Sequence, residues 1–295
     1  MSEASPSSTI ILLRDKIAGG IEVFMVKRSD RSSFVGGFYV FPGGRVEEQD
    51  ALDVAQRLCD GAEVAHKNLP GMPQTEAVAY HLAALRELYE EAGVLLVRNV
   101  EQRFISFEDK HLQQLFEGYR VASRHYQLPL FMVLEQEKLR FALDALMPWS
   151  WWVTPEEERK RFDARFFLSR FPEGQQAGHD EHETVYSLWI TPSEALERYQ
   201  AGTFQLVPPT LYTLQELAAY DSVDAVMAAA AQRPVRCMFP RAVIEGGSMS
   251  LVLPGGPGYP SVSGPDPLGI THYTFVDGKW QARSDGQLSS VGEAQ

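Results

Sequence analysis

The chain has 295 residues, 44% of them hydrophobic and 22% charged, with a formal net charge of −12 at pH 7. This composition excludes a disordered chain and suffices for one elaborated domain or one domain with an appendage. The net negative charge argues against binding to nucleic acid or an anionic membrane. The two cysteines are too few for a disulfide framework, and this favours a reducing compartment.

The N-terminal part of the chain predicts a hairpin and a glycine-rich turn. Residues 9–13 and 21–26 are short β-branched, apolar runs separated by Gly19-Gly20, as in two strands joined by a turn. Residues 38–41 predict a further strand. Pro42-Gly43-Gly44 then forces a turn in which the backbone can approach a ligand closely. The N-terminus lacks the pattern of a secretory signal and the chain has no run of about 18 apolar residues, so we expect a cytoplasmic protein.

A broken segment and a long helix follow. Residues 51–75 contain the breakers LCDG, NLPG and GMPQ, which predict an insertion. Residues 75–92 carry apolar side chains at three- and four-residue steps, which predicts a helix with one face in the core. Gly93 ends this helix, and the apolar run 94–97 predicts a short buried strand.

The second half of the chain mixes helices and strands. Residues 110–147 predict two or three helices interrupted at Pro129, which we interpret as a helical insertion. Residues 218–295 are expected to form a C-terminal extension, a helix followed by a Gly- and Pro-rich segment. The remaining predicted elements are strands over 149–153, 162–168 and 185–190, helices capped at Thr191, starting at Thr210 and over 222–232, and a hairpin over 273–278.

Three glutamates crowd onto one side of the helix in the stretch RELYEEAGV. Glu87 lies three residues before Glu90 and four before Glu91, so the three carboxylates are neighbours on the helix surface. Their repulsion would be offset by a divalent cation. Because no histidine or cysteine stands at ligand spacing, oxygen donors favour Mg²⁺ or Mn²⁺ over zinc, and Arg86 is placed to pair with Glu90. The alternative interpretation is a solvated acidic face.

RELYEEAGV matches every fixed position in the second half of the Nudix box, the signature of hydrolases that act on nucleoside diphosphates linked to another moiety. The first half begins at Gly44 and reaches Asp50, where the usual residue is glutamate. The family normally places about seven residues between this acid and the arginine, whereas 35 residues separate Asp50 from Arg86. The chain resembles a branch with a split box, which includes the animal peroxisomal coenzyme A diphosphatases.

This resemblance covers roughly residues 8–217, which we take as the Nudix hydrolase domain. It is supported outside the box by the stretches KRSDRSSFVGGFYVFPGG, WWVTP, RFDARFFL, WITPSEAL and LVPPTLYTL. The resemblance implies an α/β protein: a Nudix-type α/β/α sandwich with a mixed sheet, helical insertions and a C-terminal extension.

The resemblance also implies roles for the residues of the box. Glu90 and Glu91 would be the principal ligands of Mg²⁺ or Mn²⁺, and Glu87 a third ligand or the general base. Arg86 would orient the cluster, and the backbone carbonyl of Gly44 would complete the coordination sphere.

Some members of the family use an acidic residue from a later loop. Here the candidates for such an additional carboxylate are Glu181 and Glu183 in the stretch GHDEHET, and the alternative for both is a solvated acidic loop. His179 and His182 in the same stretch are read as exposed loop residues.

The stretch before the box bears on the substrate. Arg28 and the FPGG sequence fit the frame that coenzyme A diphosphatases share, although the second expected arginine is Ser33. Arg28 and Arg31, with Lys27, could contact an additional phosphate such as the 3′-phosphate of coenzyme A, because arginine forks pair with phosphate oxygens. The alternative is an ordinary basic loop. The remaining predicted substrate contacts are Gly43, Gly44 and Arg45.

The predicted function is metal-dependent hydrolysis of coenzyme A or acyl-coenzyme A to adenosine 3′,5′-bisphosphate and (acyl-)phosphopantetheine. A diphosphatase of ADP-ribose, NADH or nucleotide sugars is the second enzymatic interpretation. A non-catalytic nucleotide-sensing module is the third, although a sensor has no chemical need for three repelling carboxylates. The expected partner is a small molecule with a nucleoside diphosphate link, and neither nucleic acid nor membrane. A homodimer is compatible with the sequence.

Three tryptophans stand just before the VTP sequence at residues 153–155. Trp149, Trp151 and Trp152 could stack on an adenine or line an acyl pocket, but alternating aromatic residues in a strand more often belong to the core.

Overall fold

The computed structural model describes most of the chain. Two of the predicted site residues, Arg31 and Glu181, and also His182, lie outside the described residues. The described ranges are 3–30, 36–124, 128–180, 183–245, 247–260 and 266–284.

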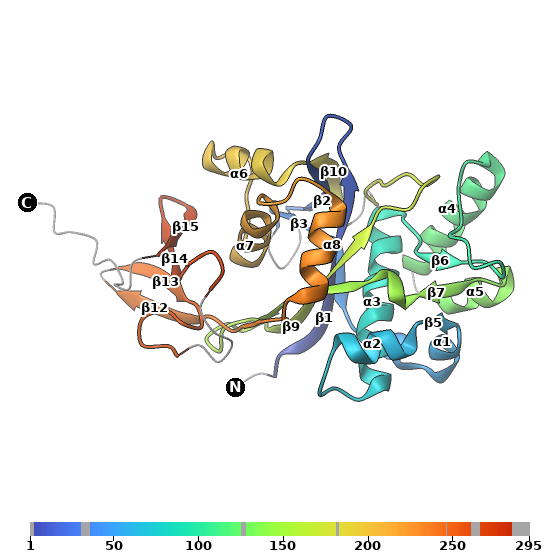
Figure 1. The fold of residues 1–295 in the computed structure, drawn as a ribbon, viewed down its shortest axis with the longest axis horizontal. Helices are drawn as coiled ribbons and strands as arrows, with labels where there is room; N and C mark the ends of the chain where they lie inside the picture. Colours follow the sequence, from blue (N-terminus) through green and yellow to red (C-terminus); the bar gives the residue numbers. More distant parts are fainter. Residues whose placement is uncertain are drawn as a thin grey trace, which may run out of the picture.

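An eight-stranded mixed sheet occupies the centre of the molecule (Figure 1). Its strands are β1 Ser5–Asp15, β2 Ile21–Arg28, β3 Tyr39–Val40, β4 Gly43–Arg45, β8 Met147–Val153, β9 Phe162–Arg170, β10 Thr184–Ile190 and β11 Cys237–Met238. The order is β10-β2-β1-β9-β8-β11, with β3 beside β2 and β4 beside β1. The pairs β1/β9 and β8/β11 are parallel and the other pairs are antiparallel.

The N-terminal hairpin is the middle of this sheet, as predicted. Leu13 pairs with Val23 across the antiparallel β1/β2 ladder. Ile10 and Leu12 of β1 belong to one core, whereas Ile11 and Leu13 belong to the core on the opposite face. The strand is therefore buried on both faces, which explains why its sequence is a continuous apolar run rather than an alternating one.

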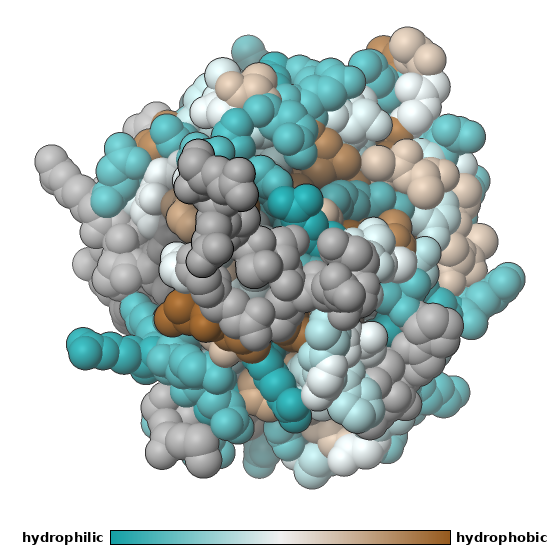
Figure 2. Space-filling view, turned by 90° about the vertical axis from the view of Figure 1, so that its left-hand side faces the viewer, coloured by the Kyte–Doolittle hydropathy of each residue, from teal (hydrophilic) through white to brown (hydrophobic). Residues whose placement is uncertain are grey.

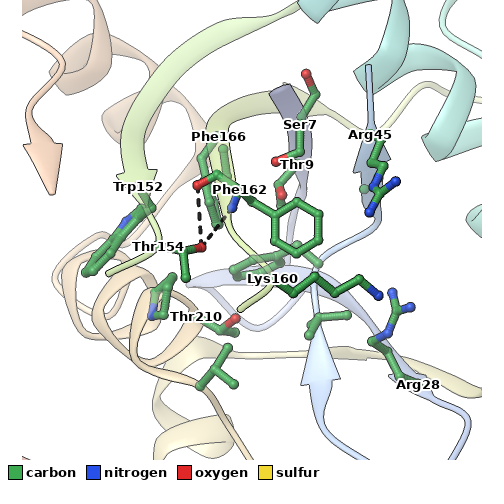
Figure 3. Close-up of a pocket in the computed structure, with 18 of the residues that line it drawn as sticks. Ser7, Thr9, Arg28, Arg45, Trp152, Thr154, Lys160, Phe162, Phe166 and Thr210 are labelled. Atoms are coloured by element: carbon green, nitrogen blue, oxygen red, sulfur yellow. Dashed lines mark hydrogen bonds between the residues drawn. The ribbon is translucent and has the colours of Figure 1, made fainter. Parts of the chain in front are cut away.

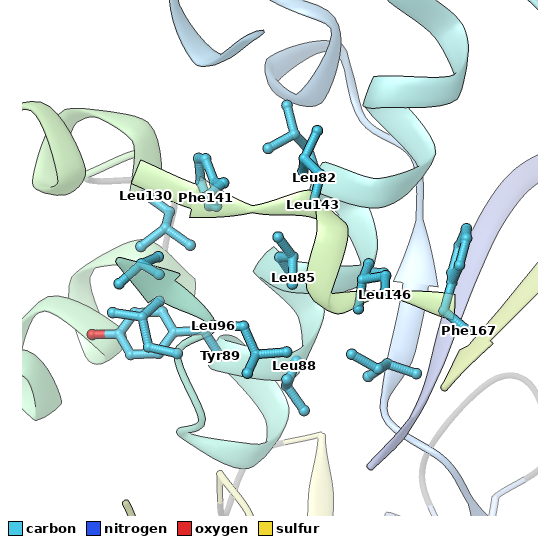
Figure 4. Packing of buried hydrophobic residues seen from close by; sticks show 14 of the residues in the cluster. Leu82, Leu85, Leu88, Tyr89, Leu96, Leu130, Phe141, Leu143, Leu146 and Phe167 are labelled. Atoms are coloured by element: carbon cyan, nitrogen blue, oxygen red, sulfur yellow. The ribbon is translucent and has the colours of Figure 1, made fainter. Parts of the chain in front are cut away.

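Helix α3, Gln74–Ala92, covers one face of the sheet and confirms the predicted long helix. Its apolar side packs into a core that also draws on the segment around residues 130–146 (Figure 4). The helix ends at Gly93, whose φ of 69° is left-handed and whose N–H donates to the carbonyl of Tyr89.

The strand predicted after this helix is shorter than expected. Only β6, Val97–Arg98, is a strand. The side chain of Gln175 takes up both backbone groups of Leu95, accepting from its N–H at 2.9 Å and donating to its carbonyl at 2.9 Å. Leu95 is buried outside a strand ladder, because a glutamine supplies the hydrogen bonds that a ladder would supply.

The other face of the sheet is covered by three helices around a second core. These are α6 Pro192–Gln200, α7 Pro208–Leu217 and α8 Val223–Gln232. The hydroxyl of Thr191 accepts a hydrogen bond from the backbone N–H of Glu194, which confirms the predicted cap. With α3 on the opposite face, the predicted α/β/α sandwich is confirmed.

The inserted segments lie beside α3 (Figure 1). Their elements are η1 Glu48–Ala51, α1 Asp53–Arg57, β5 Cys59–Asp60, α2 Ala62–Asn68, α4 Lys110–Arg124, α5 Leu130–Glu137, β7 Arg140–Ala142 and η2 Leu143–Ala145. Two helices fill most of the predicted helical insertion. In place of a third, β7 pairs with β5 and β6 in a three-stranded sheet, because Lys138 ends α5 in a left-handed conformation.

The C-terminal part of the chain forms a four-stranded antiparallel sheet. Its strands are β12 Arg241–Glu245, β13 Ser248–Val252, β14 His272–Val276 and β15 Lys279–Arg283, in that order. The predicted last hairpin is confirmed, with positive φ at both Asp277 and Gly278 as an Asp-Gly turn requires. The sequence did not predict β12 and β13. The domain boundary near residue 217 stays a prediction. Within the described ranges, no helix has the length and apolar character needed to cross a membrane.

Candidate active site

The two halves of the split motif meet at Arg86. Its Nε and Nη2 each donate to an oxygen of Asp50 at 3.0 Å, although 36 positions separate the two residues. Its Nη1 donates to Glu87 Oε1 at 2.8 Å and to Glu90 Oε2 at 3.1 Å, and its Nη2 to the carbonyl of Arg45 at 2.8 Å. The insertion therefore loops out and returns the chain, so that one buried guanidinium joins helix α3 to the glycine turn.

The glycine turn approaches α3 as closely as the backbone permits. The N–H of Gly43 donates to Glu91 Oε2 at 3.0 Å. A Cβ on Gly44 would overlap the carboxylate of Glu87, and a Cβ on Gly43 would overlap the carbonyl of Ser8. Glycine at both positions is thus a steric requirement of the site, which agrees with the close approach expected from the sequence.

Helix α4 of the second insertion supports Glu90 from the far side. The hydroxyl of Ser123 donates to Glu90 Oε1 at 2.9 Å, and Arg120 Nε donates to the Glu90 backbone carbonyl at 3.1 Å. Sequence reasoning did not find either residue, because no local spacing links them to the glutamates.

Burial dominates the electrostatics of the carboxylates. It raises the pKa of Glu87 to about 7 despite the opposing charge of Arg86. Burial and then the charge of Glu87 raise the pKa of Glu91 well above its ordinary value, and burial raises the pKa of Glu90. Burial alone would lower the pKa of Arg86, but the negative charges of Glu87, Asp50 and Glu90 raise it. The site thus holds more negative charge than one arginine compensates.

The oxygen donors of this cluster fit a hard divalent cation. Glu91 Oε1 is buried and has no hydrogen-bond partner among the described residues, with Arg28 Nη1 at 3.9 Å. In the part of the chain that the structure describes, no three acidic, histidine or cysteine side chains are arranged to hold a metal as they stand. Arg86, Ser123 and Gly43 hold other oxygens of the three glutamates. Oxygen donors of this kind suit a hard divalent cation, and the identity of the cation stays a prediction.

The carboxylates open into a cavity of about 870 Å³. Arg28 and Arg45, both predicted substrate contacts, line it, and Lys160 from the loop between β8 and β9 does so as well. Figure 3 shows Lys160 and Arg28 extending toward the same part of the cavity. Lys160 could not be predicted from the sequence, because it reaches the cavity only through the fold of the segment between β8 and β9.

The acidic loop before β10 also reaches the cavity. Glu183 lines it, and its charge contributes to raising the pKa values of both Glu87 and Glu91. Asp180 accepts from the backbone N–H groups of Glu183 and Thr184, which joins Asp180 to the start of β10. The structure thus brings Glu183 to the carboxylate cluster. His179 contacts Ser187 instead.

Much of the cavity lining is apolar. Apart from Trp152, the apolar wall could not be predicted from the sequence, because its residues come from segments far apart in the chain. It includes Trp152, Phe162, Phe166, Pro208, Pro209, Met249, Leu251 and Trp280.

The three tryptophans occupy different environments. Trp149 is fully buried in the second core, and Trp151 stacks under the guanidinium of Arg165, with 3.7 Å between the guanidinium carbon and the ring centroid. Trp152 is buried and also borders the cavity. The core interpretation therefore holds for Trp149, whereas Trp152 is both core and cavity wall.

A family model described as the NUDT19 Nudix domain matches residues 62–217 of the chain. The chain belongs to this Nudix family. It is 27% identical to the acyl-coenzyme A diphosphatase NUDT19 of Xenopus laevis over 69% of this chain and 61% of that protein. It is 28% identical to the human protein of the same name over 70% of this chain and 63% of that protein.

The alignment with these curated relatives spans just over three fifths of their length. Among solved structures, a NUDIX hydrolase from Alicyclobacillus acidocaldarius superposes with a TM-score of 0.61 at 27% identity, covering 77% of this chain and 97% of that chain. Fold and family thus agree with the motif.

Proposed function

We propose that this chain is a Nudix-type hydrolase that cleaves the diphosphate bond of coenzyme A or acyl-coenzyme A in the presence of Mg²⁺ or Mn²⁺. The products would be adenosine 3′,5′-bisphosphate and (acyl-)phosphopantetheine. The observation that carries this proposal is the cluster of Glu87, Glu90 and Glu91 around buried Arg86, which opens into a cavity that also presents basic side chains. The names of the curated relatives support the substrate class.

The cation would be held by Glu87, Glu90 and Glu91 with the backbone carbonyl of Gly44. When bound, it would screen the diphosphate and lower the pKa of an attacking water. Arg86 restricts the carboxylates of Glu87 and Glu90 to one orientation, which reduces the reorganisation needed during the reaction.

Two carboxylates are candidates for the general base. Glu87 would accept the proton of the attacking water in the case that it does not ligate the cation, since its carboxylate lines the cavity beside Glu90 and Glu91. Glu183 is the second candidate, because it lines the same cavity from a different loop.

Arg28 and Lys160 would bind a second phosphate group of the substrate, next to the scissile diphosphate. Both line the cavity, and Arg28 Nη1 lies 3.9 Å from Glu91 Oε1, so an anion bound there would lie close to the carboxylate cluster. Coenzyme A carries such a phosphate at the 3′ position of its ribose. The arginine fork and the lysine ammonium are suited to it.

An ADP-ribose, NADH or nucleotide-sugar diphosphatase remains the second candidate, because the carboxylate cluster would serve these substrates equally. A nucleotide-sensing module without catalysis is the third. The three carboxylates and the raised pKa of Glu91 disfavour a pure sensor, since burying these charges would destabilise the fold without serving chemistry.

A magnesium-supplemented hydrolysis panel tests the proposal. The substrates are coenzyme A, octanoyl-coenzyme A, dephospho-coenzyme A, ADP-ribose and NADH, with the products identified by mass. We expect adenosine 3′,5′-bisphosphate and preference for coenzyme A compounds over the dephospho form. Preference for ADP-ribose or NADH would keep the catalytic assignment and reject the substrate, whereas no turnover of any substrate would favour the sensor.

A further inference from the structure

We infer that the C-terminal sheet β12–β15 supplies the subsite that binds the acyl chain of an acyl-coenzyme A substrate. This inference rests on the proposed function and deepens it. The sheet begins at Arg241, beyond residue 217, where the match to the family model ends. The subsite is therefore a property of this chain's own C-terminal segment.

One face of the sheet is directed at the body of the molecule. Met249 and Leu251 alternate along β13 and so share a face, and the register pairs Leu251 with Tyr273. On the next ladder Phe275 pairs with Trp280, which brings Trp280 to the same face. Leu251 and Tyr273 are buried in the second core, and Met249 and Trp280 pack against it.

Three residues of this face reach the cavity that holds the carboxylates. Met249, Leu251 and Trp280 line it, together with Pro240 just before the sheet. Trp152 of β8 and Pro208 of α7 line the same cavity. The sheet thus adds an apolar wall to the cavity rather than forming a separate site.

Hydrogen bonds fix the wall in place. The hydroxyl of Tyr199 in α6 donates to the carbonyl of Trp280 at 2.9 Å and accepts from its N–H at 2.6 Å. Tyr273 donates to Gln215 of α7 at 2.7 Å. Because α6 and α7 pack on the main sheet, the position of Trp280 is coupled to the body of the enzyme.

The chemistry of the wall favours a hydrocarbon chain over an adenine ring. Met249, Leu251 and the prolines offer no side-chain hydrogen bonds, whereas the polar edge of a buried base would need them. The flexible methionine adapts to chains of different length.

The size of the cavity agrees with this assignment. At about 870 Å³ it lies in the upper part of the range of about 300–1,000 Å³ for ligand pockets. Besides the basic and acidic groups, the cavity presents apolar side chains that are available to a further part of the substrate.

The test compares two substitutions on the same face of the sheet. Met249→Glu places a charge in the apolar wall. Ile244→Glu places the same charge on β12 directly opposite, where Ile244 pairs with Met249 but is 77% exposed and does not line the cavity. Rates are measured with coenzyme A, acetyl-coenzyme A and octanoyl-coenzyme A, and folding is checked by thermal denaturation.

We expect Met249→Glu to lower the ratio of kcat/KM for octanoyl-coenzyme A to that for coenzyme A on the order of tenfold, whereas Ile244→Glu leaves the ratio unchanged. Binding of octanoyl-coenzyme A and of coenzyme A is also measured by calorimetry, with the same variants in a Glu90→Gln background. The preference for octanoyl-coenzyme A over coenzyme A should be lost in the same way. If Met249→Glu does not fold, Met249→Ala should reduce the ratio about threefold.

An unchanged ratio in a folded Met249 variant would overturn the inference. An equal loss in Ile244→Glu would also overturn it, because the effect would then come from charge on the sheet. Failure of the proposed function is distinguished by the unmodified protein, which would hydrolyse neither coenzyme A nor its acyl esters.

Discussion

Helix α3 and the C-terminal sheet line the same cavity but are specified by the sequence in different ways. In α3, Arg86 and three glutamates stand within six consecutive residues, and helical geometry alone brings them together. The apolar wall instead needs the register of β13 to β15 and hydrogen bonds to α6 and α7. The reactive groups therefore follow from local sequence, whereas the groups that we assign to substrate choice follow from tertiary structure.

Arg86→Gln should give the largest effect on the α3 side. Removing the guanidinium leaves buried Asp50, Glu87 and Glu90 without their shared positive partner, so we expect a loss of about 3–5 kcal/mol in the free energy of unfolding. Urea denaturation measures it. The matched control is Arg170→Gln, which breaks an exposed ion pair with Asp224 and should cost less than about 1 kcal/mol. An equal loss of stability in both variants would contradict the role of Arg86 as the shared partner of the buried carboxylates.

Glu90→Gln should remove activity while keeping the fold. A divalent ion contributes several kcal/mol to a reaction of this kind, so we expect kcat to fall roughly 10³-fold, or about 4 kcal/mol. Arg86 retains Asp50 and Glu87 as partners, and the melting temperature should change little. Glu76→Gln, at the exposed start of the same helix, is the control. Turnover within tenfold of the unmodified enzyme would refute the assignment of Glu90.

His81 tests whether the core side of α3 is as sensitive to charge as its cavity side. The ring is fully buried between the Ala77 carbonyl and the Asn68 amide, and burial lowers its pKa to about 4. The unfolded chain, with a pKa near 6.5, binds the proton more readily, so stability is full above that value and falls as the pH drops toward 4.

Between pH 7 and pH 5 this group should remove about 2 kcal/mol of stability. The measurement is the urea midpoint at both pH values for the unmodified protein and for His81→Gln, and the variant should lose less stability on acidification. An identical loss in both proteins would assign the pH dependence to other groups.

Tyr199→Phe tests the sheet side of the comparison. The change removes the hydroxyl that hydrogen-bonds to both backbone groups of Trp280. We therefore expect the free energy of unfolding to fall by about 1–2 kcal/mol. The ratio of kcat/KM for octanoyl-coenzyme A to that for coenzyme A should also fall, because Trp280 is less firmly held. Tyr220→Phe is a control on the same side of the main sheet. A changed stability with an unchanged ratio would show that the wall does not depend on this anchor.

Much of the fold could be predicted because its signals are local. The β1/β2 hairpin, α3 and the cap at Thr191 follow from periodicity, turn residues and capping. The bounds of the short strand after α3 could not be predicted, since Gln175 from 80 positions away takes the hydrogen bonds of Leu95. Strands β12 and β13 could not be predicted because Gly- and Pro-rich segments surround them in the sequence.

The candidate site divides in the same way. Part of the site could be predicted because its residues stand at the spacing of a sequence motif; these are Gly43, Gly44, Arg86 and the three glutamates. Lys160 and Ser123 reach the site only through the folding of distant segments, and a single sequence carries no signal of that proximity.

Arg28→Gln should give the smallest change, and this change should be in substrate preference. Arg28 lines the cavity and lies beside Glu91 of α3. With Lys160 still present, we expect the preference for coenzyme A over dephospho-coenzyme A to fall about fivefold, or about 1 kcal/mol. Lys27→Gln is the control, because Lys27 is the preceding residue of β2 but lies over the ring of Tyr39 outside the cavity. The preference is the deciding measurement, because a change at Glu91 alone would lower the rates with both substrates equally. A preference lost in Lys27→Gln instead would place the 3′-phosphate outside this cavity, and the charged groups of the cavity would then serve only the scissile diphosphate.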